Sequence, residues 1–111
     1  MKTKNQYSEH WLDGAIRHVE LLCKDAAACP EEYEAPSKQT VRNAIELLKE
    51  FEQCENPQIA LTQDGEFVLT WTHFGDKFTA IASCDGSVEL FENKNRVDHD
   101  SFARRLTSIP A

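Results

Sequence analysis

The chain has 111 residues, of which 41% are hydrophobic and 28% charged, with only four glycines and four prolines. A chain of this size forms one domain, and its composition excludes collagen-like, low-complexity and wholly disordered proteins. The net charge is −7. Because a nucleic-acid-binding protein needs a surplus of Lys and Arg to neutralise phosphates, this charge argues against direct binding of DNA or RNA.

The cellular location follows from the apolar runs and the cysteines. No run approaches the roughly 18 apolar residues that a membrane-spanning helix needs, and residues 1–6 form no apolar signal region. Disulfides are rare in the reducing cytoplasm. We therefore expect a cytoplasmic protein without membrane contact, in which the thiols stay reduced. The cysteines are Cys23, Cys29, Cys54 and Cys84.

Two helices are predicted in the first half, where apolar residues recur at steps of three and four. One covers about residues 8–27, and the other covers about residues 37–55, with Ser37 as its N-cap. Two prolines and three glutamates make the connecting segment a loop. Trp11 lies at the margin of the first apolar stripe, either as a lid on the core or as a contact residue.

The second half alternates between apolar and polar residues, which predicts strands at about 58–62, 66–73, 77–83 and 87–92. Asp64-Gly65, Gly75-Asp76 and Asp85-Gly86 supply the turns between them. Three short connections in succession predict a four-stranded antiparallel meander. A short helix is expected at about 99–107, with two inward-facing residues, Phe102 and Leu106.

This order of elements predicts an α+β fold, with the two N-terminal helices packed on one face of the four-stranded meander and a short C-terminal helix. The phase of the second strand is decisive for this arrangement. Phe67, Leu69 and Trp71 are expected to face the helices, and the even-numbered residues between them are expected to face solvent.

No catalytic motif is present. The chain has no glycine-rich phosphate loop, no Gly-x-Ser-x-Gly and no His-Glu-x-x-His. Asp98 and Asp100 flank His99 and could orient its imidazole, although a polar turn that caps the last helix is the simpler reading. We therefore expect a protein that is not an enzyme and has no cofactor.

The cysteine and histidine spacings do not match a metal site. Cys23 and Cys29 are too far apart for a zinc knuckle, and His10 and His18 would lie ~12 Å apart along one helix. No metal ligands are therefore assigned. A small-molecule or metal-binding module that uses Cys and His at the helix–sheet junction stays open as the alternative function.

The outward face of the sheet is the first candidate surface. It is either an ordinary solvent-facing sheet, for which threonine is well suited, or a partner surface anchored by Ile81 and Phe91. The edge strands could also accept a strand from another chain. The side chains expected on this face are Val68, Thr70, Thr72, Thr79, Ile81, Ser83, Glu89 and Phe91.

Acidic clusters are the second candidate surface. They serve solubility alone, or they attract a basic partner and accelerate its association. One cluster lies in the inter-helix loop and the other near the end of the second helix. The first comprises Glu31, Glu32 and Glu34, and the second comprises Glu46, Glu50, Glu52 and Glu55.

Residues 36–91 resemble a pattern in small bacterial proteins of unassigned function that mobile elements often carry. The likeness rests on the segments Pro36–Val41, Pro57–Ile59, Gly65–Trp71 and Asp85–Val88, together with Ala44. These are turn and core positions, so the resemblance implies the order of helices and strands and no activity. In type, the chain also resembles phage and plasmid accessory proteins, such as anti-CRISPR and immunity proteins.

Taken together, these features predict a non-enzymatic interaction module. It would act as an inhibitor, of the anti-CRISPR or toxin-neutralising type, that blocks a surface of a larger bacterial target. The expected partner is a basic protein or a nucleoprotein complex, and the chain itself would be a monomer or a homodimer. The expected contacts are Glu31, Glu32, Glu34, Glu46, Glu50, Val68, Thr70, Thr72, Ile81, Glu89 and Phe91.

Overall fold

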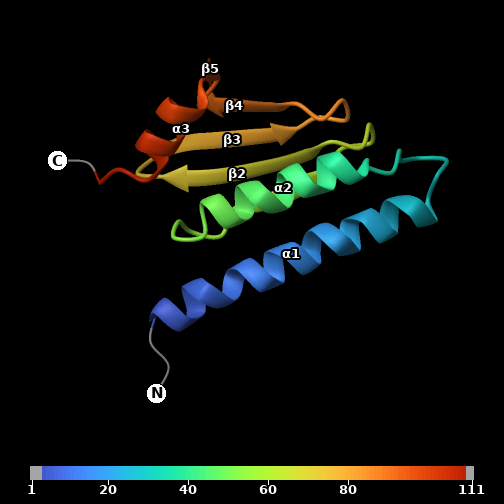
Figure 1. Ribbon diagram of the computed structural model, residues 1–111, viewed down its shortest axis with the longest axis horizontal. Helices are drawn as coiled ribbons and strands as arrows, with labels where there is room; N and C mark the ends of the chain where they lie inside the picture. Colours follow the sequence, from blue (N-terminus) through green and yellow to red (C-terminus); the bar gives the residue numbers. More distant parts are fainter. Residues whose placement is uncertain (1–3, 110–111) are drawn as a thin grey trace.

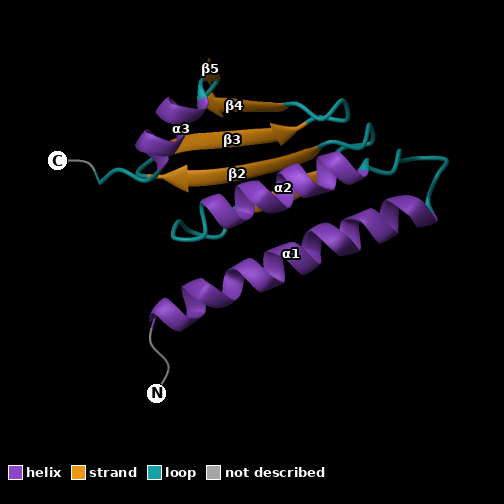
Figure 2. Ribbon diagram, viewed as in Figure 1, coloured by secondary structure: helices purple, strands orange, loops and turns teal. Residues whose placement is uncertain are grey.

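A computed structural model describes the backbone of residues 4–109 and the side chains of residues 11–109. The fold is α+β, with three helices and one antiparallel sheet (Figures 1 and 2). The elements in chain order are α1 (Lys4–Ala28), α2 (Lys38–Glu50), β1 (Gln58–Leu61), β2 (Phe67–His73), β3 (Asp76–Ala82), β4 (Val88–Glu92), β5 (Asn95–Val97) and α3 (His99–Leu106).

The sheet is a five-stranded meander in the order β1-β2-β3-β4-β5, so the prediction of an antiparallel meander is confirmed and the prediction of four strands is wrong. The first four strands lie within one residue of their expected bounds. The missed strand, β5, places Val97 opposite Leu90. Three residues are too few to show an alternating pattern, and the preceding turn uses Asn93 at φ 56° in place of a glycine.

The predicted bounds of the second helix are too long. α2 begins after the expected N-cap, since the Ser37 side chain accepts a hydrogen bond from Thr40 N–H, but it ends at Glu50 and not near residue 55. Phe51 leaves the helical conformation, and Cys54 N–H donates to Phe51 C=O at 2.9 Å. A tight turn therefore replaces the last predicted helical turn.

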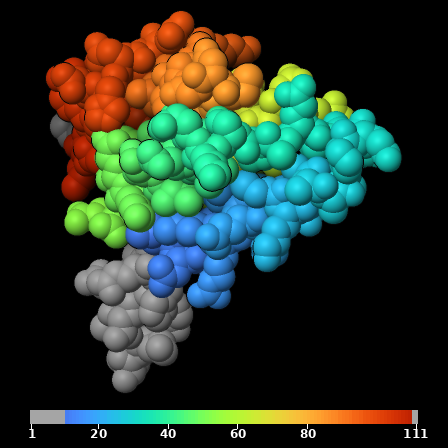
Figure 3. Space-filling model, turned by 45° about the vertical axis from the view of Figure 1, so that its right-hand side comes forward, coloured from blue at the N-terminus to red at the C-terminus, as the bar shows by residue number. Residues whose placement is uncertain are grey.

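The arrangement of the helices also differs from the prediction. α2 packs on β2 and β3, and α3 packs on β4. α1 lies along α2 (Figure 1) and contacts the sheet mainly at β1. In the space-filling view, the three helices form one continuous surface (Figure 3). The half-buried Trp11 donates its indole N–H to Cys54 C=O at 3.1 Å. This contact ties α1 to the connection between α2 and β1.

The predicted phase of β2 is confirmed. Phe67, Leu69 and Trp71 are buried against the helices, while Thr70 is half-buried and Thr72 is exposed on the other face. This alternation is typical of an antiparallel sheet with one face on the core and one in solvent.

The core is centred on four aromatic side chains that meet edge to face. Phe102 of α3 lies 5.5 Å from Phe51, 5.9 Å from Trp71 and 5.7 Å from Phe78, measured between ring centroids. Such pairs stabilise a fold by about 0.5–1.5 kcal/mol each beyond the burial of their area. Phe102 and Leu106 are both buried, as expected, so α3 is anchored on the same sheet face as α2.

One end of the sheet is closely packed. Gly65 has φ +81°, and a Cβ atom there would lie 3.1 Å from the carbonyl oxygen of Glu34. Glu34 N–H also donates to Gln63 C=O at 2.8 Å. The loop between α1 and α2 therefore lies directly on the turn between β1 and β2.

Candidate functional site

The expected contact residues lie on two opposite sides of the molecule. Val68, Ile81 and Phe91 belong to the sheet face turned away from the helices, whereas Glu46 and Glu50 are exposed on α2, which covers the other face. The sheet lies between these two sets. A single flat partner surface therefore cannot meet both.

The outer sheet face joins the predicted apolar and threonine side chains into two rows. In the first row, Val68 pairs with Ile81, which pairs with Glu89. In the second row, Thr70 pairs with Thr79, which pairs with Phe91. All these side chains are half-buried by their neighbours on the sheet. In the part of the chain that the structure describes, no helix packs on this face.

The charges on the outer sheet face are mixed rather than acidic. Glu89 carries a carboxylate that lies 3.5 Å from the Arg96 guanidinium of β5. Lys77 stands opposite Thr72 at the end of the β2–β3 ladder. Glu89, expected to meet a basic partner, is thus already paired with a cation within the chain.

The assignment of Ser83 to the outer face is wrong. Only 7% of Ser83 is exposed, and its carbonyl accepts a hydrogen bond from the Thr40 hydroxyl at 3.0 Å. β3 ends at Ala82, so Ser83 begins the turn that packs under the start of α2.

The acidic residues are exposed, but they do not form one surface. Glu31, Glu32 and Glu34 lie in the loop between α1 and α2. The Glu50 carboxylate contacts His99 Nε2 of α3 at 2.5 Å, which ties the two helices together. Asp98 serves as the N-cap of α3, as the simpler reading of that segment expected.

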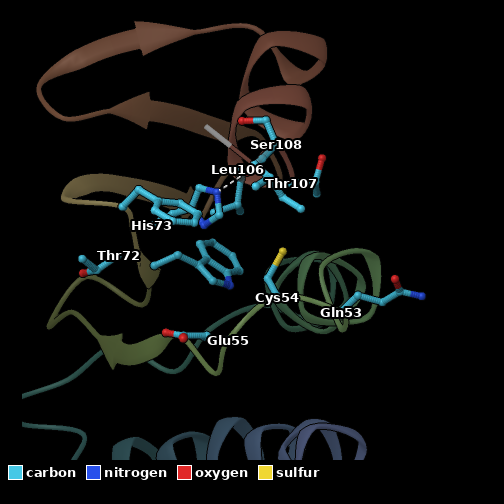
Figure 4. A pocket seen from close by; sticks show the side chains of 11 residues that line it. Gln53, Cys54, Glu55, Thr72, His73, Leu106, Thr107 and Ser108 are labelled. Atoms are coloured by element: carbon cyan, nitrogen blue, oxygen red, sulfur yellow. Dashed lines mark hydrogen bonds between the residues drawn. The ribbon is translucent and has the colours of Figure 1, made fainter. Parts of the chain in front are cut away.

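A pocket that sequence reasoning missed lies where α2, β2 and α3 end. This corner pocket has a volume of about 570 Å³, within the range typical of ligand pockets. Figure 4 shows Cys54 and Glu55 on one side, Thr72 and His73 on another, and Leu106, Thr107 and Ser108 on the α3 side. The remaining lining residues are Gln53, Trp71, Phe74 and Ile109.

Trp71, one of the lining residues, carries an unpaired hydrogen-bond donor. The residue is 2% exposed, and its indole Nε1 is enclosed without a hydrogen-bond partner. Among the residues with described side chains, it is the only enclosed side-chain nitrogen or oxygen that lacks one. Leaving such a donor unpaired costs about 1–3 kcal/mol, so the atom calls for an explanation.

Phe74 forms the exposed rim of the corner pocket. The turn was expected at Gly75-Asp76, but Phe74 and Gly75 form the two-residue turn, with φ of 50° and 84°. This left-handed conformation suits Asn or Gly and strains a bulky residue. The Phe74 side chain is nevertheless 67% exposed, and nearby Ile109 is 86% exposed.

His73 and Cys54 are the histidine and the cysteine of the pocket lining. His73 Nε2 lies 2.6 Å from Ser108 C=O, a contact that holds the segment after α3 against β2. Burial raises the pKa of the Cys54 thiol above its usual value, so this thiol stays protonated at neutral pH. The pKa of the Cys23 thiol, on α1, is likewise raised. Burial is the larger cause, and the negative charge of Glu20 is the smaller one.

The alternative of a metal-binding module finds no ligand set. Cys54 and His73 both line the corner pocket, at the helix–sheet junction. Within the described part of the chain, however, no three His, Cys, Asp or Glu residues gather as a metal site would require.

A single sequence signal could have found this site. An Asn-Gly pair is typical of a two-residue turn, and here Phe74 occupies the Asn position. An exposed aromatic at such a position is unusual. The unpaired indole had no signal in the sequence, because Trp71 is in phase with the core residues.

Comparison with known proteins gives no relative. No family model, no curated protein and no solved structure matches the chain. Among the described residues, no helix combines the length and the apolar composition needed to cross a membrane.

Proposed function

We propose that this protein is a non-enzymatic interaction module that blocks a surface of a larger macromolecule with its outer sheet face. The observation that carries the proposal is the uncovered apolar area at the centre of the sheet, where Val68 and Ile81 pair directly and Phe91 lies in the adjacent row. Apolar and aromatic anchors within a polar rim are typical of protein interfaces.

The expected partner is a larger basic protein or nucleoprotein complex. The outer face supplies apolar contact, and the net charge of −7 supplies attraction over a longer range. In this proposal the acidic clusters accelerate encounter rather than form the interface, because they lie away from the sheet face. An inhibitor of the anti-CRISPR or toxin-neutralising type fits this division, acting in the cytoplasm as a monomer or homodimer.

The thiol and histidine chemistry supports a role without catalysis. Burial holds the thiols of Cys23 and Cys54 in their protonated form, and protonated thiols are poor nucleophiles. His99 meets Glu50 in a contact between two helices at the surface. Both features are explained by packing alone.

The test is capture of a partner from a host lysate by variants of the outer face. Ile81→Lys and Phe91→Lys place charges on the proposed interface and should abolish stoichiometric capture at low salt. Leu21→Lys is the matched control, because Leu21 is an apolar residue, 57% exposed, on α1. The circular dichroism of each variant checks its fold.

Two results would contradict this proposal. One is recovery of no stoichiometric partner by the wild-type chain. The other is capture that survives both sheet substitutions but is lost with Leu21→Lys, which would move the interface to the helix side.

A further inference from the structure

We propose that the corner pocket is a second binding site, which takes an extended peptide segment of a protein partner. A backbone carbonyl of the peptide accepts the Trp71 indole N–H, an apolar side chain packs against Phe74 and Ile109, and an adjacent Lys or Arg faces Glu55. This site is separate from the outer sheet face and does not depend on the function proposed above.

The indole N–H of Trp71 lacks a hydrogen-bond acceptor. Trp71 Nε1 is enclosed and unpaired, although the ring itself lines the pocket. A buried donor destabilises a protein until an acceptor reaches it. The other tryptophan shows the usual solution, since Trp11 donates its indole N–H to Cys54 C=O. The pocket is where an acceptor from another molecule would serve Trp71.

The segments around the donor can admit such an acceptor. Gln53, Cys54 and Glu55 follow the end of α2, and Thr107–Ile109 follow the end of α3, so these two parts of the lining lie outside regular helices and strands. Because Nε1 is closed off in the free protein, the peptide reaches it by displacing side chains of these two segments.

Two apolar side chains of the pocket lining are exposed to solvent. Phe74 and Ile109 are the most exposed large apolar side chains among the described residues, and both line the same pocket. Phe74 also keeps a left-handed backbone conformation that disfavours an aromatic residue. An apolar side chain of the partner would cover both residues.

The charge of the lining selects the partner. Glu55 is exposed at the pocket, and neither Lys nor Arg occurs among the lining residues. An anionic ligand would meet the carboxylate without a compensating cation. A peptide with a basic residue next to its apolar residue complements the lining in shape and in charge.

The probe is an array of capped pentapeptides in a Gly/Ser frame, with a central apolar residue followed by Lys, Arg, Gln or Glu. The chain has two tryptophans, so its proton–nitrogen correlation spectrum contains two indole signals. The best peptide should shift the Trp71 signal downfield as its hydrogen bond forms. Trp11→Phe removes the other indole signal and so assigns the two.

Variants distinguish specific binding at this site from nonspecific apolar binding. Trp71→Phe should weaken the best peptide about tenfold, which equals about 1.4 kcal/mol. Phe74→Asn, which keeps a residue suited to the turn, should weaken it at least as much. Glu55→Gln should weaken basic peptides about threefold, whereas Glu46→Gln on the exposed face of α2 should change nothing.

The Trp71 indole signal and the charge preference of the peptides decide whether the proposal holds. The proposal is overturned if no peptide moves the Trp71 indole signal, or if peptides with Glu bind as well as those with Lys or Arg. Ile81→Lys must leave peptide affinity unchanged, because it lies on the outer sheet face. The two proposals can therefore fail independently.

Discussion

The two ends of β2 are built in different ways. At its start, Gly65 takes the left-handed conformation that glycine suits, and the Glu34 backbone packs onto the turn. At its end, Phe74 takes a left-handed conformation that aromatic residues avoid, and its side chain extends into solvent at the pocket that Trp71, with its unpaired donor, also lines. We call the Gly65 end of β2 the closed end and the Phe74 end the open end.

This difference indicates where folding and function make separate demands. At the closed end, turn chemistry, packing and hydrogen bonding all favour the same structure, as they do in a region selected for stability. At the open end, two local rules are broken within four residues of one another. Such departures concentrate at functional sites, so the open end is the better place to look for binding.

The largest predicted effect concerns the turn glycines. Gly65→Ala should lower the free energy of unfolding by about 2–3 kcal/mol, because strain at φ +81° adds to a Cβ contact of 3.1 Å with the Glu34 carbonyl oxygen. Gly75→Ala, at φ +84° with no atom within 4 Å, should cost only about 1 kcal/mol. Denaturant unfolding measures both.

Equal losses for the two glycine variants would contradict the comparison. They would mean that backbone strain accounts for both effects and that the packing of the Glu34 backbone on the Gly65 turn adds nothing.

A second prediction concerns a buried hydroxyl at the closed end. Thr40 is completely buried, and its hydroxyl donates to Ser83 C=O at 3.0 Å. Thr40→Val keeps the shape but leaves that carbonyl without this donor, so it should destabilise the protein by about 1–2 kcal/mol. Thr40→Ser, which keeps the hydroxyl, is the control and should cost less. A loss in Thr40→Ser as large as that in Thr40→Val would contradict this prediction, because removal of the methyl group would then cost as much as removal of the hydroxyl.

A third prediction concerns the unpaired indole at the open end. Trp71→Phe removes an unsatisfied donor while it loses some packing volume, and these effects oppose each other. The free energy of unfolding should therefore stay within about 1 kcal/mol of the wild-type value. Thermal and denaturant unfolding would both report it. A loss of about 3 kcal/mol or more would show that the indole is a core residue only.

Much of the fold could be predicted because the residues of each element agree with one another. The alternation of Phe67, Leu69 and Trp71 set the inner face of the sheet, and Ser37 marked the start of α2. β5 could not be predicted, because three residues carry no period. The end of α2 was also missed, since the helical pattern runs on to Phe51 and the turn that stops it depends on packing.

The candidate sites were less accessible to sequence reasoning. The outer sheet face followed from the phase of β2, but the separation of Glu46 and Glu50 from that face depended on which side α2 covers. The corner pocket is lined by the ends of α2, β2 and α3, which are distant from one another in the sequence. Nothing local indicates that Trp71 would lack an acceptor there.

The most direct test of the open end is the unfolding of Phe74→Asn. The substitution creates the preferred pair for this two-residue turn, and it removes an exposed aromatic side chain. We predict that the free energy of unfolding rises by about 0.5 kcal/mol. Peptide binding at the corner pocket should at the same time weaken about tenfold or more. A fall of about 1 kcal/mol or more would contradict the account, because it would make Phe74 a residue that the fold itself requires.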